Sequence, residues 1–517
     1  MSCFIPHEAS GGQAGRLCDT RGLPRNSVPS DLASPDHQGY LRPQPPPVQD
    51  AKAGFSDPAY ETSDGIRQVI DAIYEKSPVI FVSGRAGTGK SRLIDYLGKL
   101  PGGRRQAVVA PTGIAALSLG AQTIHSLFRL PVGVVDPAAL PEDRRLAATL
   151  GNITRLVIDE ISMVRADILD AIDARLRAAR GSGKPFGGVQ LVMVGDFLQL
   201  PPVVRPEDRQ LLEHLGYETP FAFSARALES VRIRVATLRK VWRQSEPDMI
   251  AALGAIREGR RLDGALAWLN DRCTGPHRAG VEPLLLTATR AAADAYNGAG
   301  MEEVRSGHGR MADHLQACIQ AEASGDFSAT NAALPAPRAL QLLPGARVMA
   351  VRNDPEGVYV NGSLGEVREV FDGNGALDEA YVLVRFDGHT RDVRITAADW
   401  TKARQVWNAE RDAIEQEECG RFRQIPLTQG YAITIHKSQG LSLDDVRIDL
   451  GRGAFAPGQL YVALSRARSM AGLSFARPLR VSDVRVDEMM VRFLEWARGS
   501  TTLERPAPPK APQPVPA

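Results

Sequence analysis

Short apolar runs alternate with helical patterns through the first half of the chain. Four such runs cover residues 79–82, 107–110, 156–158 and 191–194, and each is followed by a turn and then by a helical pattern. Strands that helices cover on both faces read as continuous apolar runs rather than as alternating ones. The pattern therefore predicts an α/β domain built on a parallel sheet.

A second region of the same kind begins near residue 235 and resumes near residue 427, with apolar runs at 284–286 and 431–435. Between its two parts, residues 347–395 change to short alternating strands with the hairpin signals Asn361-Gly362 and Phe386-Asp387-Gly388. This change predicts a small β-barrel inserted into the second region. Prolines and arginines interrupt the first region at 130–152, where we expect a small protruding insertion.

The two ends of the chain differ from the rest in proline content. The first fifty residues contain eight prolines and the last seventeen contain six, so we expect both ends to be disordered. The predicted layout is a tail at 1–56, a first lobe at 57–234 with a wedge-like insertion at 130–152, a second lobe in two parts at 235–335 and 425–500, a barrel with a helical connection at 336–424, and a tail at 501–517.

Composition limits the class of protein. The 517 residues include 62 Lys+Arg and 60 Asp+Glu, and this near balance neither supports nor excludes a nucleic-acid partner. No apolar stretch approaches the length of a membrane span, so we expect a soluble protein that is not secreted. The five cysteines form no Cys-x-x-Cys pair, which argues against a zinc knuckle and against a disulfide framework.

The strongest chemical motif follows the first apolar run. Residues 84–91 read Gly-Arg-Ala-Gly-Thr-Gly-Lys-Ser, fit G-x-x-x-x-G-K-[ST], and precede a helical pattern. In such a loop the glycines let backbone N–H groups face the phosphates, the lysine supplies positive charge, and the serine hydroxyl reaches Mg²⁺. The sequence therefore predicts a nucleotide site with Mg²⁺ at Gly84, Gly87, Thr88, Gly89, Lys90 and Ser91.

Polar residues follow the last two of these four runs. Asp159 and Glu160 follow the run at 156–158, where Asp159 would hold the Mg²⁺ hydration shell and Glu160 would polarise the attacking water. Gln199 follows the run at 191–194, where its amide could sense the γ-phosphate. Acids at a strand end are common, and Gln199 alone would read as a turn residue, so the phosphate loop upstream is what favours catalytic roles.

Seven segments in chain order carry a family resemblance. They cover residues 84–91, 110–116, 122–128, 159–164, 185–202, 434–440 and 459–466. In this order they resemble the DNA helicases of the petite integration frequency (Pif) family and their RecD-like relatives in superfamily one, from about residue 65 to residue 498.

The resemblance implies a fold and a motor mechanism. It implies two RecA-like lobes with ATP between them, an SH3-like barrel inserted in the second lobe, and movement 5′ to 3′ on DNA. It also implies that Arg243 and Arg466 neutralise the transferring phosphoryl group and that Gly440 helps to bind the nucleotide. Family members carry an adenine-reading glutamine before the first strand; Gln68 is the nearest candidate, although its register is slightly off.

The same motifs imply contacts with single-stranded DNA, which needs donors along its backbone and apolar faces for its bases. Phe128 and Phe197 are the candidates for stacking, although a phenylalanine in an apolar segment is more often a core residue. For His125 and His436 an ordinary buried histidine is the alternative. The full set of expected DNA contacts is Pro111, Thr112, His125, Phe128, Phe197, His436, Lys437 and Ser438.

These observations together predict an ATP-dependent DNA helicase that acts in DNA replication, repair, recombination or telomere-type maintenance. The alternatives are a DNA-stimulated ATPase that remodels protein–nucleic acid complexes and, less favoured because the motifs are intact, a pseudoenzyme that only binds DNA. Expected partners are single-stranded DNA and its junctions with duplex, with G-quadruplex and RNA–DNA hybrid as further candidates and no membrane. We also expect a monomer in a bacterial cytoplasm, associated with the nucleoid.

Overall fold

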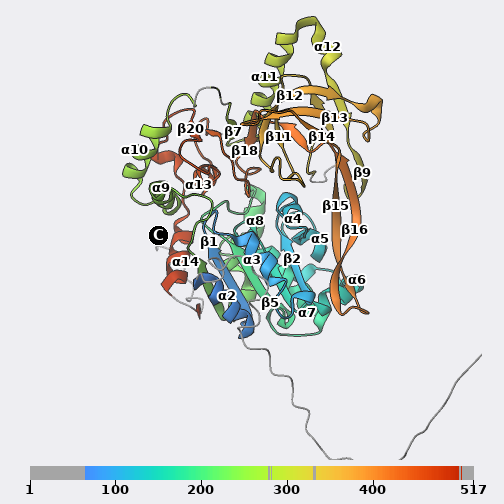
Figure 1. Ribbon diagram of the computed structural model, residues 1–517. Helices are drawn as coiled ribbons and strands as arrows, with labels where there is room; N and C mark the ends of the chain where they lie inside the picture. The colour runs from blue at the N-terminus through green and yellow to red at the C-terminus, as the bar shows by residue number, and fades with distance from the viewer. Residues whose placement is uncertain (1–63, 278–279, 281, 330–333, 500–501, 504–517) are drawn as a thin grey trace, which may run out of the picture. The chain divides into compact units, whose positions relative to one another are not determined.

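A parallel sheet forms the centre of the first lobe (Figure 1). Its strand order is β21-β6-β1-β5-β4-β2-β3, and every neighbouring pair is parallel except β21 with β6. The predicted runs lie within β1 (Val79–Gly84), β2 (Gln106–Ala110), β4 (Arg155–Ile158) and β5 (Gln190–Gly195), whose apolar side chains are buried except for the half-buried Val108. The other strands are β3 (Gln122–Thr123), β6 (Ile233–Leu238) and β21 (Thr502–Leu503).

The computed structural model describes residues 64–277, 280, 282–329, 334–499 and 502–503. The tails predicted to be disordered lie outside these residues, except that β21 falls within the segment 501–517 and is a strand. No helix in the described part of the chain combines the length and the apolar character that crossing a bilayer demands.

Helices on the first lobe are α2 (Asp64–Tyr74), α3 (Lys90–Leu97), α4 (Gly113–Ser118), α5 (Ile124–Phe128), α6 (Arg144–Asn152), α7 (Ala166–Arg180) and α8 (Pro206–His214). The predicted wedge at 130–152 is only partly a surface segment. Leu146 and Leu150 on α6 belong to the lobe's core, so the exposed part of the insertion precedes α6. The lobe also extends beyond residue 234, because β6 pairs with β1 along its whole length.

The second lobe is a smaller parallel sheet with strand order β18-β7-β19-β20. Its strands are β7 (Leu284–Thr287), β18 (Ala432–Thr434), β19 (Val446–Asp449) and β20 (Leu473–Phe475). The second α/β region is therefore confirmed. Its helices are α9 (Pro247–Glu258), α10 (Leu262–Cys273), α11 (Arg290–His308), α12 (Ala312–Leu315) and α13 (Gln459–Leu464).

The insertion in the second lobe contains a five-stranded antiparallel sheet where the hairpin signals predicted a small β-barrel, and its strand β17 lies beyond the predicted boundary at residue 424. Its order is β14-β13-β12-β11-β17, and a register shift interrupts β12 between Val367 and Glu369. Buried valines of β11, β12 and β13 fill its core. The strands are β11 (Arg347–Ala350), β12 (Leu364–Phe371), β13 (Tyr381–Phe386), β14 (Val393–Thr396) and β17 (Leu427–Gln429).

A helical connection within 336–424 was expected, and this expectation is wrong. Residues 398–424 form a long hairpin of β15 (Ala398–Asn408) and β16 (Ala413–Gln424), which pairs with β9 (Glu322–Gly325). Most residues of both strands are exposed or half-buried, as expected for a ribbon that extends away from a core. The helices α11 and α12 lie before residue 336, and a further pair, β8 (Ala317–Gln320) with β10 (Ala339–Leu342), completes the insertion.

The hairpin reaches back to the first lobe, where β15 runs toward α6 (Figure 1). The Gln405 side chain donates to the carbonyl of Val108 over 2.7 Å and accepts from its N–H over 3.3 Å. The Gln405 N–H donates to the side chain of Gln122 over 2.6 Å. Strand β3 is only two residues long and pairs with Val109 and Ala110 of β2, so it does not reach Val108. The Gln405 amide takes its place and satisfies both the N–H and the carbonyl of Val108.

The C-terminal helix α14 (Glu488–Gly499) belongs to the first lobe, although the sequence assigned residues 425–500 to the second. Met490, Leu494 and Ala497 are buried in the core of the first lobe. The ring of Phe493 stacks on Phe223 with centroids 4.8 Å apart. The chain therefore crosses from one lobe to the other a second time near its end.

We predict that Leu494→Ala lowers the free energy of unfolding by about 2–5 kcal/mol, because the leucine is 2% exposed and its removal leaves a cavity. Met489→Ala on the same helix is the control, since Met489 is 48% exposed and should change stability by no more than about 0.5 kcal/mol. Urea unfolding of both variants measures the difference. Equal stability of the two variants would contradict the assignment of α14 to the first core.

Candidate nucleotide site and nucleic-acid interface

The phosphate-loop motif forms a turn between β1 and α3, as its context predicted. Gly87 and Gly89 have φ of +76° and +85°, a region that side chains other than glycine rarely adopt. A Cβ at Gly84 would lie 2.5 Å from the Thr88 hydroxyl, so that position also requires glycine. Lys90 begins α3, and its Nζ donates to the carbonyls of Gly84 and Arg85 over 2.9 and 3.1 Å.

A pocket of about 520 Å³ opens beside this loop, within the size range of small-molecule sites. Both lobes contribute to its wall. The first lobe supplies residues 86–92, Glu160 and Gln199, and the later part of the chain supplies Trp242, Arg243, Gly440, Ser442, Arg466 and Arg468. The structure thus brings the predicted Gly87, Thr88, Gly89, Lys90 and Ser91 together with Glu160, Gln199, Arg243, Gly440 and Arg466.

The two acids at the end of β4 differ in their surroundings. Glu160 lines the pocket with φ of +49°, a strained conformation of the kind found at functional sites, and its Oε2 accepts from the Gln439 amide over 3.0 Å. Asp159 is buried, and its Oδ1 has no hydrogen-bond partner. Burial, together with the negative charge of Glu160, raises the pKa of Asp159 to about 7.

The two predicted arginines are held by carbonyls near the pocket. Arg466 is almost fully buried, and its guanidinium donates to the carbonyls of Val462, Ser438 and Leu441. Burial and the nearby charge of Arg243 lower the pKa of Arg466 to about 9. Arg243 donates to the carbonyls of Ser465 and Gly440 over 3.1 and 3.4 Å.

The predicted Gly84 and Asp159 adjoin the pocket without lining it, and the structure places Gln68 away from it altogether. Gln68 is exposed on α2 and is not part of the pocket wall, in keeping with the imperfect register of the motif. The helical repeat explains the position, because Gly65, Ile66 and Val69 occupy the buried face of α2 and direct Gln68 outward.

Three contacts across the seam between the lobes were missed at the level of sequence. The N–H of Ala86 in the phosphate loop donates to the Tyr461 hydroxyl over 3.1 Å, and the Gln439 amide donates to Glu160. Both Tyr461 and Gln439 lie in motif segments, so the resemblance could have pointed to them. Arg257 on α9 lies in no motif.

Arg257 forms a buried ion pair with Asp196 across the seam. Its Nε and Nη2 donate to the two Asp196 carboxylate oxygens over 2.9 and 2.6 Å, and both side chains are almost fully buried. Burial opposes ionisation of Asp196, but the Arg257 charge outweighs it and holds the pKa of Asp196 below its ordinary value. The other bonds of Asp196 go to the N–H of Leu198 and the amide of Gln199.

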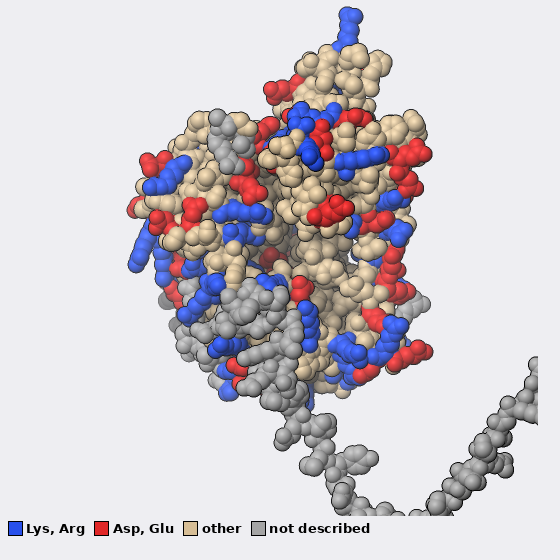
Figure 2. Space-filling model, viewed as in Figure 1, with Lys and Arg blue, Asp and Glu red and all other residues tan. Residues whose placement is uncertain are grey.

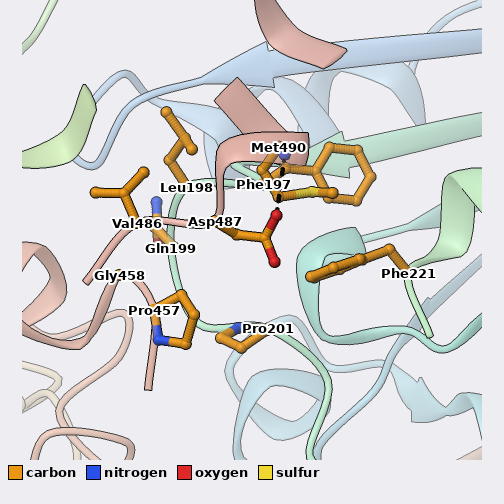
Figure 3. A pocket seen from close by; sticks show the side chains of 10 residues that line it. All are labelled: Phe197, Leu198, Gln199, Pro201, Phe221, Pro457, Gly458, Val486, Asp487 and Met490. Carbon is orange, nitrogen blue, oxygen red and sulfur yellow. Dashed lines mark hydrogen bonds between the residues drawn. The ribbon is translucent and has the colours of Figure 1, made fainter. Parts of the chain in front are cut away.

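The seam is also closed by a close backbone approach (Figure 3). Gly458 precedes α13 with φ of +72°, and a Cβ there would lie 2.4 Å from the Gln199 carbonyl oxygen. Leu198, Gln199 and Pro201 face Pro457 and Gly458 across this junction, with Met490 of α14 beside them. The loop after β5 therefore contacts the second lobe through both its side chains and its backbone.

The residues expected to contact DNA divide into exposed and buried groups. On the first lobe, Pro111, Thr112 and His125 are half-buried beyond the ends of β2 and β3, and Thr112 caps α4 by accepting from the Ala115 N–H over 3.3 Å. On the second lobe, Lys437 is exposed and His436 is half-buried. Burial lowers the pKa of both His125 and His436, which favours neutral imidazoles.

Three expected DNA contacts are not available in this structure. Phe128 is fully buried in the first core because it ends a short amphipathic helix. Phe197 is 4% exposed in a cluster with Phe81 and Phe493, whose rings lie 5.2 and 5.4 Å away. Ser438 is fully buried, and its hydroxyl donates to the carbonyl of Ile435 over 2.7 Å. For both phenylalanines the core interpretation holds.

We predict that Arg257→Ala lowers the free energy of unfolding by about 3–5 kcal/mol, because it leaves Asp196 as an unpaired buried charge. The paired replacement Asp196→Asn with Arg257→Met should recover part of this loss, since neither charge remains. Urea unfolding measures both. A double variant that is no more stable than Arg257→Ala would contradict the assigned cause.

A family model and individual protein sequences both match this chain, and both indicate the same family. The model of the PIF1-like helicase family matches residues 60–252. The ATP-dependent DNA helicase PIF1 of Homo sapiens is 34% identical over 527 residues, covering 98% of this chain and 74% of the human protein. The ATP-dependent DNA helicase Pif1 of Bdellovibrio bacteriovorus is 32% identical over 403 residues, covering 76% of this chain and 83% of that protein.

Solved structures agree with the sequence comparison. Bacteroides sp Pif1 in complex with ADP-AlF4 superposes with a TM-score of 0.72 at 32% identity, covering 85% of this chain and 98% of that one. Bacteroides Pif1 bound to ssDNA superposes with a TM-score of 0.59 at the same identity, covering 84% and 97%. Two RecA-like lobes with an inserted barrel, as the motifs implied, are thus the fold of this chain.

Proposed function

Because this chain belongs to the Pif1 family of ATP-dependent DNA helicases, we propose that it moves 5′ to 3′ along single-stranded DNA and separates duplex strands. The observation that carries this proposal is the 520 Å³ pocket, whose wall is made by the phosphate loop on one lobe and by Arg243 and Arg466 beyond the seam. A ligand that touches both lobes can change how closely they approach, and this coupling is what a motor requires.

In the proposed reaction the γ-phosphate of ATP is transferred to water. Glu160 accepts the proton of the attacking water, and Arg243 and Arg466 neutralise the charge on the transferring phosphoryl group. Lys90 and the N–H groups at the start of α3 hold the phosphates. Release of Arg466 from its carbonyl partners would accompany ATP binding, since a planar guanidinium offers five donors that can be shared with phosphate oxygens.

The site also suits Mg²⁺. Asp159 Oδ1 is a buried carboxylate oxygen without a partner, Ser91 offers a hydroxyl at the start of α3, and oxygen ligands are those that Mg²⁺ prefers. We assign Ser91 and Asp159 as the residues that would hold the ion. When bound, it would neutralise phosphate charge.

The proposed DNA path crosses the carboxyl edges of both sheets. Pro111, Thr112 and His125 would grip the strand on the first lobe, and His436 and Lys437 would grip it on the second. Figure 2 shows acidic and basic side chains interspersed over the visible face, so local groups rather than a field of one sign would guide the strand. Alternate closing and opening of the lobes would move it.

The element that splits the duplex is proposed to be the surface part of the insertion, residues 131–143. Val132 is exposed there, while Asp167 accepts from the Val135 N–H over 2.8 Å and fixes the base of the loop. Forked duplex, G-quadruplex and RNA–DNA hybrid are the proposed substrates, and unwinding assays on each of them compare their rates.

We predict ATP-dependent unwinding of a duplex with a 5′ single-stranded tail and none of a duplex with a 3′ tail. Lys90→Ala should lower ATP turnover by about 100-fold or more, because a group that stabilises the transition state is lost. Lys99→Ala, an exposed lysine on the same lobe, is the matched control. DNA-stimulated turnover without unwinding of either duplex would instead support an ATPase that remodels protein–nucleic acid complexes.

We predict that Glu160→Gln retains ATP binding and lowers turnover by about 100- to 10,000-fold, since a glutamine cannot accept the proton. A fluorescent ATP analogue measures binding, and phosphate release measures turnover. Glutamine keeps a carbonyl oxygen that can accept from Gln439, so the contact across the seam survives the change. Turnover near that of the wild type would remove Glu160 from the catalytic role.

A further inference from the structure

One exposed aromatic ring lies next to the proposed DNA path and has no role in the motifs discussed above. Phe455, in the loop between β19 and α13, is 56% exposed. Its ring stacks against the imidazole of His436 with centroids 6.2 Å apart and an angle of 16° between the planes. Single exposed apolar residues are common on protein surfaces, so the position of Phe455 rather than its exposure carries the argument.

Three strands of the second sheet end side by side near this ring. Thr434 of β18 and Asp449 of β19 are both paired in register with Thr287 of β7 between them. Neighbouring parallel strands lie about 4.8 Å apart, so the segments that follow these residues leave the sheet along a common edge. His436 and Phe455 both lie in such segments, and ligands of open parallel sheets bind at this edge.

Exposed basic side chains occupy the same edge. Lys437 follows β18, Arg290 follows β7, and Arg452 follows β19, and all three are exposed. Two acidic side chains near this edge have protein partners. The Asp294 Oδ2 lies 3.9 Å from the Arg290 Nε, and the Asp449 Oδ2 accepts from the Tyr296 hydroxyl over 2.7 Å. Aromatic rings among basic groups are the arrangement that binds single-stranded nucleic acid without sequence preference.

The loop that carries Phe455 is fixed in place. The Phe455 N–H donates to the side-chain oxygen of Gln459 over 3.0 Å, and the Gln459 amide donates to the carbonyl of Ala288 over 3.2 Å. Gln459 itself is fully buried. The ring is therefore presented from a rigid base, which lowers the entropy lost when a base stacks on it.

We propose that Phe455 is a stacking residue for an unpaired base of single-stranded DNA, which contacts the ring on the side away from His436. Phe455 would take the role that the sequence assigned to the buried Phe128 and Phe197. The proposal rests on the proposed function, because it names one contact of the same DNA path.

The test compares oligo-dT with an abasic strand of the same length, using fluorescence anisotropy of labelled strands and the full chain. Phe455→Ala should weaken binding of oligo-dT by about tenfold or more, and Phe455→Trp should bind within about threefold of the wild type. On the abasic strand Phe455→Ala should bind as the wild type does, because no base is present to stack. Met311→Ala, at a residue 57% exposed between α11 and α12, is the control and should not change binding.

The outcomes separate this inference from the proposed function. A wild-type chain that binds neither strand would refute both. If Phe455→Ala binds oligo-dT as tightly as the wild type does, the stacking role alone is refuted. An equal loss on the abasic strand would also refute it, since the effect would then come from the shape of the loop or from phosphate contacts.

Discussion

A buried ion pair between Asp196 and Arg257 ties the two lobes of this protein together at the point where the nucleotide would be sensed. Charges removed from water are stable only when they are fully paired, so the pair permits few relative positions of its two partners. Asp196 stands at the end of β5 and also bonds to Gln199, whereas Arg257 stands on α9 in the second lobe. The pair therefore connects the loop after β5 directly to α9 of the second lobe.

The groups that would meet a triphosphate already have protein partners in this structure. Lys90 bonds to carbonyls of its own loop, the Ala86 N–H bonds to Tyr461, and Glu160 accepts from Gln439. Nucleotide binding would therefore exchange protein hydrogen bonds for bonds to phosphate and water. Since two of these bonds cross the seam, the exchange would alter the contact between the lobes as well as the pocket.

The topology of the sheets explains why the nucleotide and the proposed DNA path lie near each other. In a parallel sheet every strand ends at the same edge, so residues far apart in sequence gather there. On the first lobe this edge carries the phosphate loop and Thr112, and on the second it carries His436 and Phe455. The β15–β16 hairpin and α14 add further links between parts of the chain, through Gln405 and through the core contacts of Leu494.

The sequence by itself determined the elements whose signal is local. Continuous apolar runs predicted the main parallel strands, the pattern G-x-x-x-x-G-K-[ST] identified the phosphate loop, and the order of motifs identified the family and most of the residues that line the pocket. Only the tertiary structure decided which apolar side chains face a core: Phe128 and Phe197 are buried, while Phe455 is exposed. The tertiary structure alone showed the Asp196–Arg257 pair, the contact of the β15–β16 hairpin with the first lobe and the packing of α14 in the core of the first lobe. All three depend on contacts between residues distant in sequence. Periodicity reports the face of an element and not the partner that covers it.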